Sequence, residues 1–192
     1  MTITESTVRK VLQHPYDYRW TVQGFGMMRT YLDPDEVHRL HIWDTNCAVP
    51  DVSVIHDHPW DFDSRIYSGT VINQRYRFAD EVDGLDTAPM RIGRIKTGEG
   101  GGLDPASVHD TWLAVPEAEE YLPGDSYHMD RPELHESIPS PGAVTIISRK
   151  FYTARDDQFA TVCWAAGAEW VTAEPRPATR EEIEHFIKLV DL

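Results

Sequence analysis

The strongest chemical signal in this sequence is a short segment with two histidines at H-x-H spacing, residues 54–62 (VIHDHPWDF). Side chains alternate between the two faces of a β-strand, so His56 and His58 lie on the same face and can reach one metal ion. Asp57 lies on the opposite face, where we expect a structural role, and Pro59 ends the strand. Because H-x-H spacing also arises by chance, the rest of the chain has to supply further evidence.

A second segment with candidate metal ligands spans residues 121–135 (YLPGDSYHMDRPELH). It contains His128, on an expected strand over Tyr127–Met129, and His135, which competes with it as third ligand. Asp61 and Asp63 are ambiguous, because a carboxylate is more often exposed than bound to a metal. Three other histidines are predicted to be solvated: His14, His109 and His185.

Short segments rich in β-branched and aromatic residues must position these side chains. They are separated by turn signals from the 13 prolines and 12 glycines of the chain, and comprise residues 20–22, 39–43, 52–58, 65–73, 127–129 and 143–151. Many short strands without alternation of strand and helix predict an all-β, antiparallel sandwich or barrel. Residues 79–104 are expected to form long surface loops with one hairpin at Met90–Lys96.

Two short helices are expected, one at each end of the chain. Hydroxyl side chains precede an amphipathic run over Thr4–Gln13, and His14 ends it because the residue before a proline is disfavoured in a helix. Thr179 and Glu182 have the spacing of a capping box and precede apolar residues at helical spacing. We therefore predict a single domain, with an N-terminal helix and arm over residues 1–18, a β-barrel over 19–171 and a C-terminal helix over 178–192.

The composition fits one globular domain, at about 150 residues per domain. The 192 residues include 18 Lys and Arg against 32 Asp and Glu, a formal net charge of −14, which argues against nucleic acid or an anionic membrane as partner. Without an apolar stretch near the ~20 residues of a membrane span, or a secretory signal, we expect a cytoplasmic protein. Cys47 and Cys163 are far apart and imply neither a disulfide nor a cysteine-based zinc site.

The two histidine segments resemble the two motifs of the cupin superfamily, and the resemblance covers roughly residues 19–171. The first cupin motif is G-x5-H-x-H-x3,4-E-x6-G, and the chain matches it at His56, His58 and Gly69, with Pro50 at the first glycine. The second is G-x5-P-x-G-x2-H-x3-N, and the chain matches it at Gly124 and His135. The resemblance implies a double-stranded β-helix of the jelly-roll type, in agreement with the all-β prediction.

The same resemblance implies a metal site made of His56, His58 and His135. His135 is preferred to His128 because its distance from Gly124 fits the second motif, whereas that of His128 does not. His128 is then a pocket residue near the ligands. His128 and Asp63 remain the alternative ligands.

Many cupins have a glutamate ligand in the first motif, and this chain has either Phe62 or Asp63 there, depending on how the spacing is counted. A site of three histidines is similar to that of the thiol dioxygenases, which implies Fe(II), with Zn, Mn, Ni or Cu as the other divalent metals. Those enzymes have a catalytic histidine and tyrosine on the strand after the third ligand. This chain has Ile147 and Arg149 at those positions, which argues against thiol oxidation by the same residues.

Three neutral histidines leave the charge of a metal ion uncompensated, which favours an anionic substrate at the open positions. Arg65, Arg75 and Arg149 lie on expected strands, and an inward guanidinium would bind a carboxylate through two parallel hydrogen bonds. Tyr67 and Tyr127 would supply a phenol to the same pocket. Arginine side chains are usually exposed to solvent, and tyrosine side chains on the strands of a sandwich are usually in the core. The catalytic candidates are thus Arg65, Tyr67, Tyr127 and Arg149.

These observations lead us to expect a mononuclear non-haem iron oxygenase that uses O2 and a small anionic or amino-acid-like metabolite. The alternatives are a non-catalytic small-molecule-binding cupin and a metal-dependent isomerase or lyase. An inward carboxylate or tyrosine beside the metal would favour the isomerase, and a metal-free apolar barrel would favour the binding protein. The family resemblance also implies a homodimer, because an open sandwich has sheet edges to cover.

Overall fold

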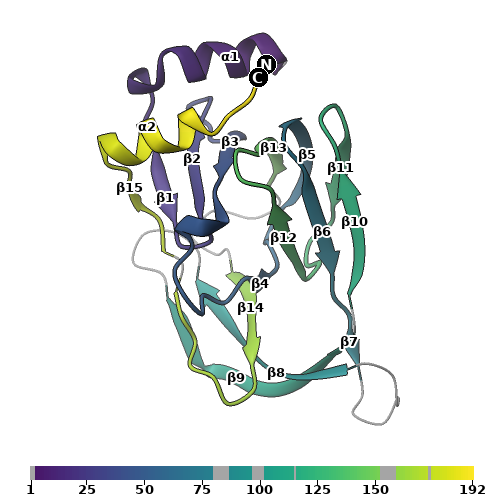
Figure 1. Ribbon diagram of the computed structural model, residues 1–192. Coiled ribbons are helices and arrows are strands. Elements are labelled where there is room, and N and C mark those ends of the chain that lie inside the picture. Colours follow the sequence, from purple (N-terminus) through teal and green to yellow (C-terminus); the bar gives the residue numbers. More distant parts are fainter. Residues whose placement is uncertain (1–2, 80–86, 97–101, 115, 152–158, 173) are drawn as a thin grey trace.

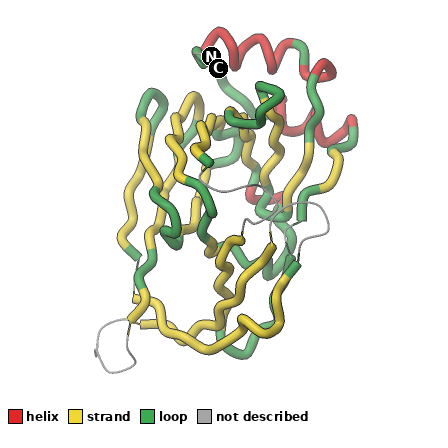
Figure 2. The backbone as a smooth tube through the Cα atoms, turned by 180° about the vertical axis from the view of Figure 1, so that it is seen from behind, coloured by secondary structure: helices red, strands yellow, loops and turns green. Residues whose placement is uncertain are grey.

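The chain folds as a mostly β structure with two antiparallel sheets and a short helix near each end (Figure 1). The computed structural model describes residues 3–79, 87–96, 102–114, 116–151, 159–172 and 174–192. One sheet curls into a half-barrel, and the two sheets together form a jelly-roll-like sandwich (Figure 2). Both termini meet at the end that carries the helices. The predicted all-β class with two short helices is confirmed.

The first sheet has seven strands. Their spatial order is β11 (Ser126–Met129), β5 (Asp61–Ser68), β13 (Val144–Lys150), β3 (His38–Trp43), β2 (Met27–Tyr31), β1 (Thr21–Gln23) and β15 (Arg176–Pro177). β3 pairs with β13 on one side and with β2 on the other. It is therefore a central strand, with no edge exposed to solvent.

The second sheet has eight strands. Their order is β10 (Glu117–Tyr121), β6 (Val71–Arg75), β12 (His135–Pro139), β4 (Ile55–His56), β14 (Phe159–Ala165), β8 (Thr87–Lys96), β9 (Leu103–Ala114) and β7 (Phe78–Ala79). Of the strand expected over residues 52–58, only the two residues of β4 pair with neighbours. His56 lies directly opposite His135 on β12.

Residues 87–96, in the segment 79–104 that was expected to form mainly loops, form a long antiparallel pair with residues 103–114. Met90–Lys96, expected to form a hairpin by itself, is part of β8 and pairs with β9. The reason is burial, because Ile92 and Leu113 from the two strands pack around Cys163 and Leu134. Residues 80–86 and 97–101 of the expected loops lie outside the described part of the chain.

The two α-helices are capped as their sequences predict. α1 (Glu5–Gln13) begins with reciprocal hydrogen bonds between Thr4 and Thr7, and α2 (Arg180–Lys188) begins with a capping box between Thr179 and Glu182. Two 3-10 turns, η1 (Pro15–Asp17) and η2 (Thr45–Cys47), follow α1 and β3. Within the described residues, neither helix has the length or hydropathy needed to cross a membrane.

Both faces of the first sheet are buried. On the outer face, the helices pack against β2, β3 and β13 through a cluster that includes Val11, Ile183, Phe186, Leu40 and Ile42. On the inner face, a second cluster fills the space between the sheets and includes Met27, Trp43, Ile66 and Val71. The apolar side chains of β3 pack outward against the helices, so its remaining side chains point into the barrel.

Two glycines of the cupin-like motifs sit where only glycine is unstrained. Gly69 begins the β5–β6 turn with φ +67°, and a Cβ there would lie 2.7 Å from the Cα of Ala143. Gly124 has φ +99° in the turn before β11. Both positions favour glycine because a side chain in the left-handed region is strained. The two glycine matches therefore have a physical reason in the fold.

Candidate metal centre

Three histidines converge inside the sandwich, as the two sequence motifs predicted. The rings of His56 and His58 are 4.8 Å apart between centroids, His56 and His135 are 4.8 Å apart, and His58 and His135 are 5.1 Å apart. One nitrogen from each ring lies within 4.8 Å of the others. β4 and the residues after it supply the first two rings and the start of β12 supplies the third.

Backbone carbonyls fix the orientation of two of these rings. The Nδ1 atom of His56 donates to the carbonyl of Val54 at 2.8 Å, and the Nδ1 atom of His135 donates to the carbonyl of Glu133 at 3.1 Å. A carbonyl oxygen only accepts, so the proton of each neutral ring is on Nδ1 and the lone pair is on Nε2. The two Nε2 atoms are therefore in the state that a metal ion requires.

Burial keeps all three rings neutral. Desolvation lowers the pKa of His56, and desolvation followed by the charges of His56 and His135 holds the pKa of His58 well below its ordinary value. For His135, desolvation and then the charge of His56 lower the pKa to about 3. At neutral pH no proton has to leave these rings before a cation binds.

Asp57, between the first two ligands, fastens their segment to the neighbouring strand. The backbone N–H of Thr161 on β14 donates to its carboxylate at 2.6 Å, and the N–H of Asp57 donates to the carbonyl of Thr161 at 3.0 Å. Its side chain is buried, as expected for the face opposite to the histidines. Asp57 has the structural role that the strand alternation predicted.

Aromatic rings surround the triad. Trp60 stacks on His58 at 4.1 Å between centroids, and Phe25 stacks on His56 at 5.3 Å. Phe62 lies 5.4 Å from His58 and 6.0 Å from His135. Phe62, one of the two positions that the cupin resemblance gives to a glutamate, therefore faces the histidines and presents an apolar ring.

Two arginines contact Trp60, whose ring stacks on His58. The guanidinium carbon of Arg39 lies 5.7 Å from the centroid of the Trp60 ring, and that of Arg149 lies 5.2 Å from it. Arg149 was predicted as a candidate, and it lies on the inner side of β13. Arg39 was not predicted. Its side chain alternates with Leu40, which packs under the helices, so Arg39 points inward and is 6 % exposed.

A third arginine and a tyrosine complete this cluster on β2. Arg29 lies opposite His41, and Tyr31 lies opposite Arg39. Burial alone would raise the pKa of Tyr31, but the charges of Arg39, Arg29 and Arg149 together bring it below its ordinary value. Among the described residues, no ion pair joins Arg29 or Arg39 to a carboxylate, whereas Arg149 pairs with Glu36 at 3.8 Å. The inner end of the barrel is positively charged.

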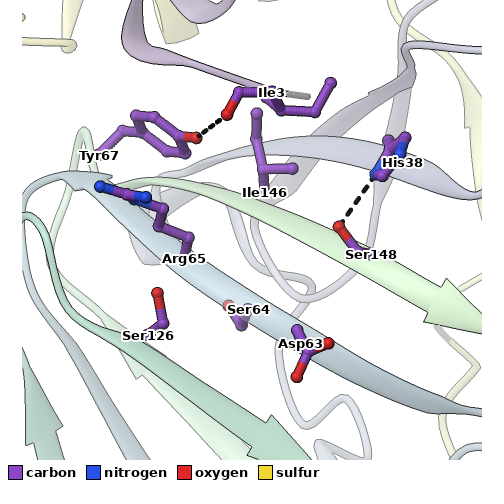
Figure 3. Close-up of a pocket in the computed structure, with 9 residues that line it drawn as sticks. All are labelled: Ile3, His38, Asp63, Ser64, Arg65, Tyr67, Ser126, Ile146 and Ser148. Atoms are coloured by element: carbon purple, nitrogen blue, oxygen red, sulfur yellow. Dashed lines mark hydrogen bonds between the residues drawn. The ribbon is translucent and has the colours of Figure 1, made fainter. Parts of the chain in front are cut away.

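Arg65 and Tyr67, two of the predicted catalytic residues, are not brought to the histidines. They alternate with Phe62 and Ile66 along β5 and therefore lie on its other face. Figure 3 shows both lining a cavity of about 170 Å³ near the N-terminal segment, where the Tyr67 hydroxyl donates to the carbonyl of Ile3 at 3.3 Å. The strand alternation that buries Phe62 and Ile66 excludes them from the metal centre.

The alternative ligands, His128 and Asp63, also lie away from the triad. They face each other across β11 and β5, with His128 Nδ1 2.8 Å from the Asp63 carboxylate and its Nε2 3.2 Å from Asp130. Their hydrogen bonds, that to Asp63 most of all, raise the pKa of His128. Both side chains are on the solvent side, so His135 is the third histidine and neither alternative joins it.

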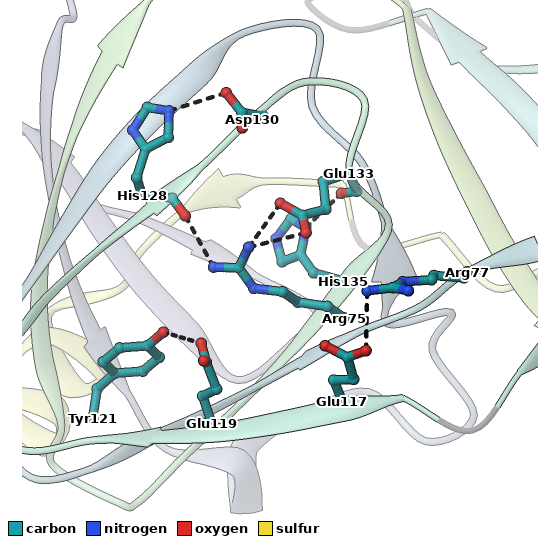
Figure 4. A network of polar contacts seen from close by, with 9 residues as sticks. All are labelled: Arg75, Arg77, Glu117, Glu119, Tyr121, His128, Asp130, Glu133 and His135. Atoms are coloured by element: carbon teal, nitrogen blue, oxygen red, sulfur yellow. Dashed lines mark hydrogen bonds and ion pairs between the residues drawn. The ribbon is translucent and has the colours of Figure 1, made fainter.

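Arg75 supports the loop that leads to the third histidine. Figure 4 shows its guanidinium bound to both carboxylate oxygens of Glu133 at 3.0 Å and to the carbonyl of His128 at 3.0 Å. Arg75 lies opposite His135 in the β6–β12 register. It holds the loop before His135 in place, and both of its terminal nitrogens are engaged there.

Tyr127 is on the inner side of β11, where the ring of Phe62 lies between it and the triad. It contacts Phe62 at 6.1 Å and Tyr121 at 4.6 Å between centroids, and Phe62 in turn contacts His135. Burial raises the pKa of Tyr127. Its phenol is therefore part of the aromatic wall and is protonated at neutral pH.

No protein-family model matches the chain, and no curated protein is similar enough in sequence to count as a relative. Its chemistry must be inferred from the site itself. That site is a buried triad of neutral histidines inside a β-sandwich, with donor atoms close enough to bind one metal ion.

Proposed function

We propose that this chain is a cupin-type enzyme, a mononuclear non-haem iron oxygenase that acts on a small anionic or amino-acid-like molecule with O2 as co-substrate. The observation that carries the proposal is the convergence of His56, His58 and His135 in a buried, neutral state. The cupin-like motifs that contain these residues, and the jelly-roll-like sandwich around them, support it.

The donor set fits a divalent transition metal. Imidazole nitrogen suits iron, zinc, copper and nickel, and three protein ligands leave coordination positions open for substrate or water. A closed structural site would have four protein ligands. Bound iron(II) would supply the reaction with O2, and the residues of the chain would bind and orient the other reactant.

The arginines supply the affinity for an anion. Arg39 and Arg149 both contact the Trp60 ring that stacks on His58, so an anion bound by their guanidiniums lies next to the triad. Their charge acts in a dry, low-dielectric interior, where it is worth more than in water. The apolar Phe62 in place of a glutamate removes a negative charge that would otherwise repel such a substrate.

Unpaired polar atoms on the inner face of β6 also support a polar ligand. Asn73 is fully buried, and neither its amide nitrogen nor its oxygen has a hydrogen-bond partner among the described residues. It lies on β6 two residues from Arg75, which is opposite His135. Unpaired buried polar atoms are costly, so they indicate a site that is completed by bound water or ligand.

A metal-dependent isomerase or lyase is the second candidate, and Tyr31 favours it. The three guanidiniums that lower the pKa of Tyr31 also make its phenol a better proton donor. In this candidate, Tyr31 holds or transfers a proton while Arg39 and Arg149 bind the anionic group. A barrel lined by arginines and an unpaired asparagine agrees less well with an apolar binding module.

The deciding experiment begins with metal analysis of protein purified without oxygen. We expect one ion per triad in the wild type and at least tenfold weaker binding in His135→Ala, with His109→Gln, an exposed histidine, as matched control. The Fe(II)-loaded protein is then screened with amino acids, thiols and small carboxylates in an oxygen electrode.

Oxygen uptake that needs both the triad and one of these molecules supports the oxygenase. Turnover without oxygen supports the isomerase or lyase and refutes the oxygenase. Binding of an anion that shifts the metal spectrum, with no turnover of any kind, refutes both enzymes and leaves a binding module.

A further inference from the structure

A second cluster of metal-binding side chains lies where the C-terminal helix meets the first sheet. Asp44 follows β3, Cys47 ends η2, and His185 is in the last turn of α2. The His185 Nε2 atom is 2.8 Å from Asp44 Oδ2, the Cys47 sulfur is 3.5 Å from the same oxygen, and the sulfur is 3.8 Å from His185 Nε2. His185, predicted to be fully solvated, is thus fixed by a buried carboxylate.

These distances match the ligand separations around one tetrahedral ion. Zinc bonds of about 2.3 Å to sulfur and about 2.0–2.1 Å to nitrogen or oxygen place sulfur about 3.5 Å from either of the other ligands, and nitrogen about 3.3 Å from oxygen. The observed separations of 3.5, 3.8 and 2.8 Å differ from these values by about half an ångström at most. Rotation of exposed Cys47 and half-exposed His185 is enough to close the difference.

The carboxylate of this cluster is oriented before any cation arrives. Asp44 is 3 % exposed, and one of its oxygens accepts from the backbone and side-chain amides of Asn46 at 3.1 and 2.9 Å. Its other oxygen is the one that faces Cys47 and His185. Burial and then the charge of Asp44 raise the pKa of the Cys47 thiol.

We propose that Asp44, Cys47 and His185 bind one thiophilic divalent cation of the zinc class. Binding releases the Cys47 thiol proton to solvent and places the remaining ring proton of His185 on Nδ1, so that sulfur, nitrogen and oxygen each give a lone pair. The fourth position is left for water. No local motif indicates this site, because its ligands come from segments about 140 residues apart and Cys47 has no nearby second cysteine.

The ion would fasten α2 to the body of the protein. α2 contributes Ile183 and Phe186 to the core on the outer face of the first sheet. η2 precedes the segment that leads to the histidine triad. The second site is therefore a structural clamp on the helix, separate from the triad, and it does not depend on the function proposed for the triad.

The test uses cobalt as a spectroscopic probe in the full chain. In a His58→Ala/His135→Ala background, we expect one Co²⁺ per chain and a sulfur-to-cobalt charge-transfer band in the near ultraviolet. Adding Cys47→Ser should abolish the band, and adding His185→Gln should weaken Co²⁺ binding at least tenfold. His109→Gln, at an exposed histidine away from the cluster, should change neither. The absence of the band in the parent background would overturn the proposal.

Alkylation of the wild-type protein gives an answer that does not depend on the folding of any variant. Cys47 is exposed and Cys163 is buried, with its pKa raised to about 12 by burial, so iodoacetamide should modify Cys47 selectively. Zinc should slow this modification at least tenfold, as followed by peptide mass. An unchanged rate with saturating zinc would overturn the second site, while metal binding by the triad in Cys47→Ser tests the first site separately.

Discussion

Arg39 provides the sharpest test of the anion site, because its removal should stabilise the protein. The side chain is almost fully buried, and among the described residues its polar contacts are to neutral groups, with Arg39 Nε donating to His41 Nε2 at 2.7 Å. Burial, and next the charge of Arg29, hold the pKa of Arg39 well below its ordinary value, which shows that the folded state disfavours the charge. Arg39→Met removes that charge and keeps most of the volume.

The expected net effect follows from two opposing contributions. A buried ion costs several kcal/mol of desolvation when no counter-ion compensates it, and repulsion from Arg29 and Arg149 adds to this cost. Against it stand the hydrogen bond to His41, about 1.5–3 kcal/mol for a charged donor, and the contact with Trp60, about 1–2 kcal/mol. We expect Arg39→Met to raise the free energy of unfolding by about 1–2 kcal/mol.

Urea unfolding at pH 7, with chelator and without added anions, measures this quantity. Arg9→Met, which removes an exposed arginine, is the matched control and should change stability by less than about 0.5 kcal/mol. Titration with small carboxylates of the Fe(II)-loaded proteins should show at least tenfold weaker binding in Arg39→Met. A loss of more than about 1 kcal/mol in Arg39→Met would show that the arginine is a structural element and would refute the anion site.

Three further predictions concern the triad and the core. In metal-free protein, His135 takes up a proton below about pH 6.5 in the unfolded chain but only near pH 3 in the folded chain. The free energy of unfolding is therefore highest above pH 6.5 and decreases as the pH falls. His135 accounts for about 2 kcal/mol of the decrease in unfolding free energy between pH 7 and pH 5. In urea unfolding, His135→Gln should therefore lose about 2 kcal/mol less than the wild type over this range. Equal decreases in the two proteins would contradict the lowered pKa of His135. Asp57→Ala leaves the Thr161 N–H unpaired and should cost about 1–3 kcal/mol and weaken metal binding by the triad, as followed by calorimetry, whereas intact affinity would separate Asp57 from the site. Phe186→Ala should cost about 3–5 kcal/mol by thermal unfolding but leave the metal stoichiometry of the triad unchanged, and a lost ion would link the helix to the triad.

The histidine triad was predictable because its signal is local and periodic. His56 and His58 share a face in any strand, whereas the third ring was selected by the resemblance to the second cupin motif, which the spacing from Gly124 to His135 fits. The alternation along β5 also held information that was not used. Phe62 and Ile66 are apolar and share one face, so Arg65 and Tyr67 had to lie on the other.

The arginine cluster was not predictable in the same way. On a strand with one solvated face, alternation of Arg39 and His41 with Leu40 and Ile42 indicates that the polar side chains face water. β3 is instead covered on both faces, because the terminal helices bury Leu40 and Ile42. The polar residues then face the barrel interior. Only the tertiary arrangement of α1 and α2 reveals this inversion.

Charge balance connects these features of the interior. The whole chain has a formal net charge of −14, so its long-range field repels anions. Three neutral histidine rings, the apolar ring of Phe62 and the guanidiniums of Arg29, Arg39 and Arg149 give the inner barrel a charge opposite in sign to that of the whole chain. Salt screens the surface over about 8 Å at physiological ionic strength but screens buried charges much less. If the proposed function is right, short-range contacts hold the anion inside the barrel, and a cation bound by the triad would strengthen them.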